Sequence, residues 1–185
     1  VLITKKEKDN NKNGFKESNA PKRPTVLESD YYYAKAKGKE FAVIIGLWPD
    51  TNRPFEVFAF ENPPINKNTR GKTIKVKKGH YKFVNGEFEI DNLQLSSDSI
   101  EERTLTLTAS MLLRHGAPIK YVNKVIQKID DNITSFSSVV RRYLSRYISE
   151  EKIDGEKCPY CGSEMIMQDG CSKCINPECG YSKCG

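Results

Sequence analysis

The sequence predicts an α+β fold, in which an antiparallel sheet is followed by three helices, plus a small C-terminal zinc ribbon. Three observations indicate this class. Residues 31–92 are rich in β-branched and aromatic residues separated by turn signals. Residues 96–148 carry apolar residues at helical spacing. All six cysteines fall between Cys158 and Cys184, which is too many for one tetrahedral metal site.

The N-terminal residues 1–24 are rich in Lys, Asn and Glu and poor in apolar residues, a composition that predicts a flexible tether. The opening stretch "VLITKKEKDN" lacks the apolar core of a signal peptide, and no apolar run approaches the roughly 18–20 residues that span a bilayer. Paired C-x-x-C cysteines in such a chain indicate metal and thiol chemistry in a reducing compartment. We therefore expect a cytoplasmic protein with no membrane partner.

Residues 30–92 are expected to form an antiparallel sheet of about five strands. The segments "YYYAKA", "FAVIIGLW" and "FEVFAF" combine aromatic and β-branched residues, and the turn signal "PDTNRP" separates the last two. "KTIKVKKG" alternates apolar residues with Lys, as a half-exposed strand does. "YKFVNGEFEI" predicts a hairpin with a type I′ turn at Asn85-Gly86, because this pair accepts positive φ at both positions.

Three helices are predicted to follow the sheet. The first begins after "SSDS", has acidic residues in its first turn and ends at "RHG". Pro118 opens the second, whose apolar residues lie along one face. The third is expected from about Asn132 to Ile148. Sheet and helices together make one α+β domain over residues 25–149, and a polar, Gly-containing linker is expected at 150–157.

The last segment, residues 158–185, is the predicted zinc ribbon. "CPYCG" is typical of a zinc knuckle, in which a tight turn directs backbone N–H groups at the cysteine sulfurs. A hairpin turn is expected at Asp169-Gly170. "CINPECGY" repeats the Cys-Gly ending, so the favoured ligand set is Cys158, Cys161, Cys174 and Cys179. Two uniform C-x-x-C pairs would instead select Cys158, Cys161, Cys171 and Cys174. Either set makes a closed, structural site, because four thiolates leave no open position on Zn²⁺.

Two thiols remain outside either metal set. They are Cys171 and Cys184 in the favoured set, and Cys179 and Cys184 in the rival set. Lys183 precedes Cys184 and favours its thiolate form. A thiol pair beside a zinc module is suited to disulfide exchange.

The closing stretch "KCPYCGSEMIMQDGCSKCINPECGYSKCG" resembles the C-terminal cysteine-rich zinc finger of adenosylcobalamin-dependent (class II) ribonucleotide reductases. The segments "RPTVLESDYYYAKAKGKEFAVIIGLW", "RPFEVFAF", "KKGHYKFVNGEFEI" and "LLRHGAPIKYV" resemble the region that follows the catalytic barrel of these enzymes. The resemblance spans residues 22–185. The second knuckle departs from the family, since Cys174 and Cys179 are separated by four residues, and the catalytic barrel is not within these 185 residues.

The resemblance implies a redox role. Tail thiols would reduce the disulfide that each turnover leaves in the active site of a partner barrel, which holds adenosylcobalamin, and thioredoxin or glutaredoxin would then reduce the tail. Cys184 would be the attacking thiol, with Cys171 as the resolving partner, or Cys179 as the alternative. Zn²⁺ would be structural.

Two other interpretations stay open. "CINPECGY" is also similar to the zinc ribbons of type IA topoisomerases, which bind single-stranded DNA. Residues 156–185 carry three Lys, no Arg and four acidic residues, which argues against nucleic acid as a partner. The third interpretation is a purely structural zinc module.

Overall fold

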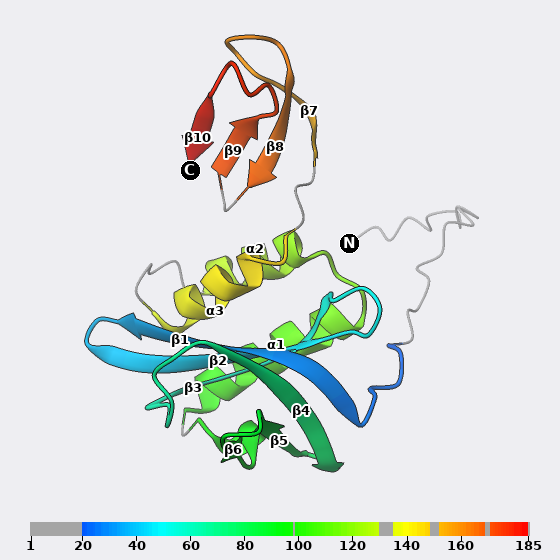
Figure 1. Cartoon of the computed structure of the whole chain (residues 1–185), viewed down its shortest axis with the longest axis vertical. Helices are drawn as coiled ribbons and strands as arrows, with labels where there is room; N and C mark the ends of the chain where they lie inside the picture. The colour runs from blue at the N-terminus through cyan, green and yellow to red at the C-terminus, as the bar shows by residue number, and fades with distance from the viewer. Residues whose placement is uncertain (1–19, 98, 130–134, 149–151, 169–170, 185) are drawn as a thin grey trace, which may run out of the picture.

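The computed structural model describes residues 20–97, 99–129, 135–148, 152–168 and 171–184 (Figure 1). Its first part is a six-stranded antiparallel sheet in the order β3-β2-β1-β4-β5-β6. The strands are β1 (Val26–Ala36), β2 (Lys39–Leu47), β3 (Pro54–Glu61), β4 (Thr69–Lys77), β5 (His80–Val84) and β6 (Glu89–Ile90). The expected sheet is therefore confirmed, with six strands in place of about five.

The tightest hairpin joins β1 and β2, where Ala36 pairs with Lys39. The two residues between them, Lys37 and Gly38, have φ of 49° and 75°. This pair of positive angles is the signature of a type I′ turn, whose twist matches that of the flanking strands. The sequence predicted a type I′ turn at Asn85-Gly86 instead. That position was wrong, although the turn type does occur in the sheet.

At the predicted position, Asn85 does not have positive φ, and the loop between β5 and β6 is four residues long. The Asn85 side chain stabilises this longer loop, because its Oδ1 accepts hydrogen bonds from the backbone N–H groups of Glu87 (3.0 Å) and Phe88 (3.1 Å). The loop directs the Phe88 ring against Tyr31 and Phe83, at centroid distances of 6.1 and 5.9 Å. Core packing of an aromatic ring thus outweighs the local turn preference.

Three helices follow the sheet: α1 (Ile100–Arg114), α2 (Ile119–Ile129) and α3 (Phe136–Ser145), with a short 3-10 turn, η1 (Leu93–Leu95), before α1. The Ser99 side chain accepts the N–H of Glu102 and caps α1. Ser135 caps α3 in the same way, so the third helix begins at Phe136, not near Asn132. No helix in the described ranges is long and apolar enough to cross a membrane.

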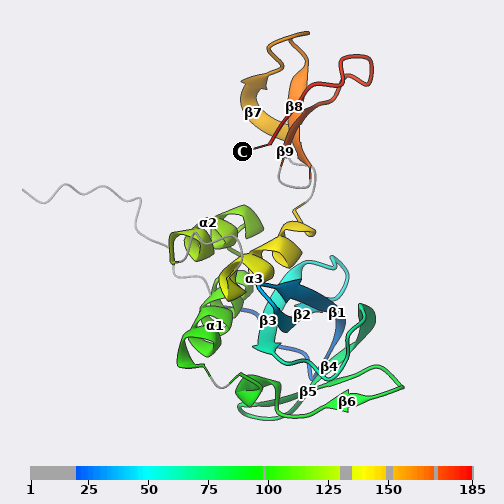
Figure 2. The ribbon, with the colours of Figure 1, turned by 90° about the vertical axis from the view of Figure 1, so that its left-hand side faces the viewer.

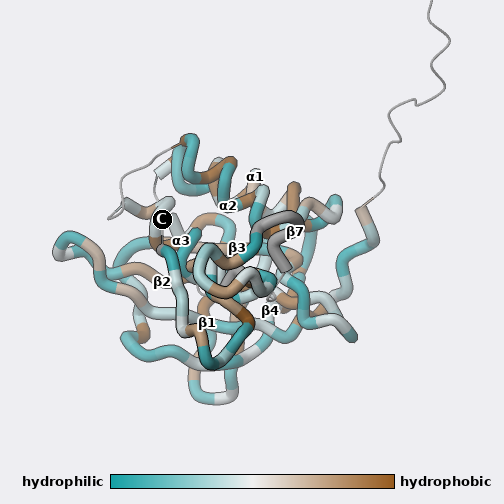
Figure 3. Tube along the Cα trace, turned by 90° about the horizontal axis from the view of Figure 1, so that it is seen from above, coloured by the Kyte–Doolittle hydropathy of each residue, from teal (hydrophilic) through white to brown (hydrophobic). Residues whose placement is uncertain are grey.

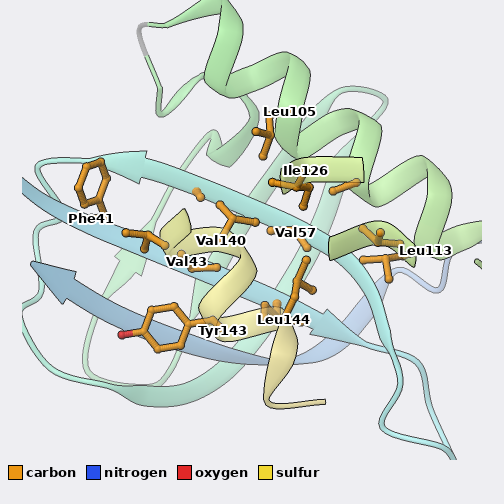
Figure 4. Close-up of a cluster of buried hydrophobic side chains, with 14 of the residues drawn as sticks. Phe41, Val43, Val57, Leu105, Leu113, Ile126, Val140, Tyr143 and Leu144 are labelled. Carbon is orange, nitrogen blue, oxygen red and sulfur yellow. The ribbon is translucent and has the colours of Figure 1, made fainter. Parts of the chain in front are cut away.

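The helices cover one face of the sheet (Figure 2). The core between them combines residues of β2 and β3 with residues from all three helices, including Val43, Val57, Leu113, Ile126 and Leu144 (Figure 4). A second buried cluster on the opposite sheet face contains Tyr31, Ala42, Ile44, Phe58, Phe60, Phe83 and Leu93. Because β2 contributes to both clusters, its sequence is a continuous apolar run instead of an alternating one.

The prediction of a flexible tether over residues 1–24 is wrong at Arg23, which is bound to the sheet. Its guanidinium donates from Nε to Glu56 Oε2 (2.8 Å) and from Nη2 to Glu56 Oε1 (2.6 Å). Arg114 Nη2 also donates to Glu56 Oε2 (2.9 Å), and the Glu56 side chain is fully buried. A buried carboxylate requires such partners, so Arg23 is fixed to the domain. Residues 1–19 of the predicted tether lie outside the described residues.

The cysteine-rich part forms a separate four-stranded antiparallel sheet in the order β10-β9-β8-β7 (Figure 1). Its strands are β7 (Lys152–Lys157), β8 (Glu164–Gln168), β9 (Cys171–Cys174) and β10 (Ser182–Cys184). The expected linker at 150–157 therefore contains a strand, because β7 adds its backbone to the edge of β8. The predicted turn at Asp169-Gly170 lies outside the described residues.

Candidate metal centre and adjacent disulfide

Two tight turns position the candidate metal ligands. In the first, Gly162 has φ of 72° and donates its N–H to the carbonyl oxygen of Cys158 (2.9 Å). In the second, Gly180 has φ of 62° and follows Cys179, whose N–H donates to the carbonyl oxygen of Asn176 (3.1 Å). Both turns end in a residue with positive φ, where glycine is favoured. The knuckle geometry expected from "CPYCG" thus occurs twice.

The two turns bring four sulfur atoms together. The Sγ atoms of Cys158, Cys161, Cys174 and Cys179 all lie within 4.8 Å of one another. The Sγ–Sγ distance is 3.6 Å between Cys158 and Cys179, and 3.3 Å between Cys161 and Cys174. Tetrahedral Zn²⁺ with Zn–S bonds of about 2.3 Å places its sulfurs about 3.8 Å apart. The donor set and its spacing therefore fit a tetrahedral zinc ion.

The ionisation of these thiols supports the same assignment. Hydrogen bonds from the hydroxyl and the backbone N–H of Ser163 lower the pKa of Cys161 to about 6, whereas burial raises the pKa of Cys174 to about 12. Adjacent thiolates repel one another, so they cannot all ionise without a cation among them. A divalent ion bound here would deprotonate its ligands and neutralise that repulsion. Ser163 was not singled out in the sequence, because a serine after a knuckle has no distinctive pattern.

Cys171 is not a member of this cluster. It lies on β9 and is disulfide-bonded, whereas the four clustered cysteines are free. In the ladder between β9 and β10, the register pairs Cys184 with Cys171. The structure thus brings together the four cysteines of the favoured ligand set. The rival set includes Cys171, which lies outside this cluster.

The ribbon also carries an aromatic pair, of which Tyr160 is exposed and Tyr181 is partly buried. The rings of Tyr160 and Tyr181 lie 5.1 Å apart between centroids, and Tyr160 is 80% exposed. No histidine or carboxylate joins the candidate metal cluster within the described residues.

The fold and the cluster define an α+β domain followed by a tetracysteine ribbon. Residues 27–149 match the family model described as the NrdJ homologue C-terminal domain. The match covers more than half of the chain, and the chain therefore belongs to this family. NrdJ is a ribonucleotide reductase, so membership links the chain to that enzyme. No curated protein and no solved structure matched the chain.

Proposed function

We propose that this chain is the C-terminal part or a small subunit of a ribonucleotide reductase, and that Cys171 and Cys184 form its exchangeable thiol pair. The observation that carries the proposal is the separation of the cysteines into two groups: four free thiols are clustered, and Cys171 is disulfide-bonded outside them. Membership of the NrdJ-related family supports the link to the reductase.

Cys184 is the proposed partner of Cys171, because their backbones face each other in the β9–β10 ladder. Directly opposed residues of antiparallel strands have Cα atoms about 4.5–5.5 Å apart, which lies within the range that disulfides span. The C-terminal strand β10 is three residues long and pairs only with β9 among the described strands. Few backbone contacts therefore hold Cys184 against the ribbon, and release of β10 would let it reach a partner site.

The exchange proceeds in two steps. The Cys184 thiolate attacks the active-site disulfide of the catalytic domain, forms a mixed disulfide and releases one active-site thiolate, which takes up a proton. The Cys171 thiolate then attacks the Cys184 sulfur, closes the Cys171–Cys184 disulfide and releases the second active-site thiolate. Two electrons and two protons pass to the active site, and a dithiol protein of the thioredoxin or glutaredoxin class reduces the tail again.

The metal-binding ribbon supports this exchange without taking part in it. Cys158, Cys161, Cys174 and Cys179 would hold Zn²⁺, which has no redox chemistry of its own and would keep these four thiols out of the exchange. Because β9 begins at Cys171 and ends at Cys174, a metal held by Cys174 would anchor the strand that carries the resolving thiol. The reductase reaction itself belongs to the catalytic domain, for which adenosylcobalamin is the proposed radical source.

The test measures the zinc content of serine variants of the full chain, and the turnover of each variant when it is assayed together with the matching reductase catalytic domain. Cys184→Ser should keep its full zinc content and lose turnover driven by thioredoxin, while a small dithiol that reaches the active site directly should restore part of it. Cys171→Ser should behave in the same way. Cys179→Ser is the matched control, and it should lose zinc. Unchanged thioredoxin-driven turnover in Cys184→Ser would exclude the exchange role, and zinc loss in Cys171→Ser would exclude the ligand set.

A second candidate is a ribbon that binds single-stranded nucleic acid. It is favoured by the exposed ring of Tyr160, which lies beside Tyr181, because bases stack on exposed aromatic rings. Tyr160→Ala would then weaken binding of a labelled single-stranded DNA and leave the thioredoxin-driven turnover unchanged. Absence of DNA binding by the parent chain at low salt would remove this candidate.

A further inference from the structure

Helix α1 carries apolar side chains on two opposite sides. Its inner face buries Leu105, Ala109 and Leu113 against the sheet and the other helices. Its outer face presents Ile100, Leu107 and Met111, which are 69%, 52% and 54% exposed. These three residues are spaced by seven and four positions and therefore lie in one stripe. Figure 3 shows that apolar (brown) and polar (teal) residues are interspersed along the chain. A helix that is apolar on two sides is typically covered on both.

A groove of about 510 Å³ runs beside this stripe. Its floor is the β3 segment Val57–Ala59, and its walls include Ile100 and Leu107 of α1. The opposite wall is formed by the turn between β4 and β5 together with η1, whose Leu95 is 58% exposed. The groove and the stripe share Ile100 and Leu107 and lie where α1 packs along β3. Figure 2 shows this side of the domain as a ribbon. We call it the α1 groove.

The charged residues that line the α1 groove are positive wherever the structure describes them. Lys78, Arg103 and Arg114 line it, and no carboxylate among the described residues does. Within the described part of the chain, neither Lys78 nor Arg103 takes part in an ion pair. The buried carboxylate of Glu56 is shared by two guanidinium groups, those of Arg23 and Arg114, so this trio retains one net positive charge.

The Arg114 guanidinium adds a directional feature to this charge. Nη2 donates to Glu56, whereas Nε is buried and has no hydrogen-bond partner among the described residues. A buried donor without an acceptor is destabilising, so an acceptor supplied from outside would be favoured. At Val57 the edge of β3 beneath it is already satisfied, because Ser110 Oγ accepts from the N–H of Val57 (2.9 Å) and donates to its carbonyl (3.2 Å). Side-chain recognition is therefore favoured here over strand addition.

We infer that the α1 groove is a docking site for an acidic amphipathic segment of a partner protein. The apolar side chains of that segment would cover Ile100, Leu107 and Met111, and its carboxylates would face Lys78, Arg103 and Arg114. Charge complementarity selects this occupant over a second copy of the chain, which would bring the same cations towards each other. The site is independent of the thiol chemistry of the ribbon.

The experiment measures binding of two synthetic helical peptides to the full chain by fluorescence anisotropy. Both carry leucines at helical spacing, and their flanking positions are Glu in one and Lys in the other. The Glu peptide should bind and weaken as salt is added, and the Lys peptide should not bind. Leu107→Glu and Arg103→Glu should each reduce the affinity about tenfold or more. Val125→Glu is the matched control on α2, where the side chain is 40% exposed, and it should leave the affinity unchanged.

Four results would overturn the inference: no binding of the Glu peptide up to ~1 mM, equal binding of both peptides, an equal loss in the Val125→Glu control, or preferential binding of the chain to anionic lipid vesicles through Leu107. Sedimentation of the chain alone tests the remaining possible occupant of the groove, a second copy of the chain. A dimer that Leu107→Glu converts to a monomer would assign the groove to self-association instead.

Discussion

The buried carboxylate of Glu56 permits a sharp test of what joins the N-terminal segment to the sheet. The substitution Glu56→Gln keeps the size of the side chain and removes its charge. The carboxylate accepts hydrogen bonds from Arg23 (2.6 and 2.8 Å), Arg114 (2.9 Å) and Thr73 (3.1 Å). An amide has only one acceptor oxygen, so its NH₂ group would face at least one guanidinium donor.

The expected cost is large because the partners are also buried. The Arg23 side chain is 6% exposed and that of Glu56 0%. Removal of one member of a buried ion pair costs about 3–5 kcal/mol, since the other charge is left uncompensated. A domain of this size has a free energy of unfolding of about 5–15 kcal/mol. Glu56→Gln should therefore remove roughly a fifth or more of the stability.

The assay is urea denaturation followed by the fluorescence of Trp48, the only tryptophan, whose ring lies 4.9 Å from Phe55. The matched control is Glu61→Gln, also on β3, which accepts from Lys39 Nζ at 2.7 Å but is 29% exposed. An exposed pair is worth less than about 1 kcal/mol. Equal losses in the two variants would refute the assignment of Glu56 as a buried anchor.

Three further predictions concern the core. Gly71→Ala should destabilise the sheet by about 1–3 kcal/mol, because an added Cβ would lie 2.4 Å from the carbonyl oxygen of Val84; chemical denaturation measures it. Leu144→Ala should cost about 2–5 kcal/mol, because this fully buried side chain leaves a cavity between α3 and the sheet, and thermal denaturation measures the loss. Burial raises the pKa of Tyr31 to about 12, so the contribution of this group to stability should be complete below pH 10 and fall by about 1.4 kcal/mol per unit between pH 10 and 12. Tyr31→Phe should flatten that fall, and Tyr160→Phe, on an exposed ring, should not.

Local patterns in the sequence determined much of the fold. The helices α1 and α2 begin where the Ser99 cap and Pro118 predict, because capping and proline geometry depend on adjacent residues only. The apolar run of β2 and the alternation in β4 likewise predict strands from their own composition. The two knuckle turns follow from Cys-Gly pairs, and the structure brings together the four cysteines of the favoured set.

Only the tertiary structure decided which distant residues meet. Arg23 lies in a segment with the composition of a solvated tail. It is fixed to the domain only because its guanidinium bonds to Glu56, 33 residues away. β7 has the composition of a linker, and it is a strand because β8 offers a free edge. Likewise, spacing alone allowed Cys171 in the metal site, and the β9–β10 register places it opposite Cys184 instead. Local sequence specifies turns, caps and strand character because these depend on neighbouring residues, whereas long-range pairing depends on the energy of the whole packed chain.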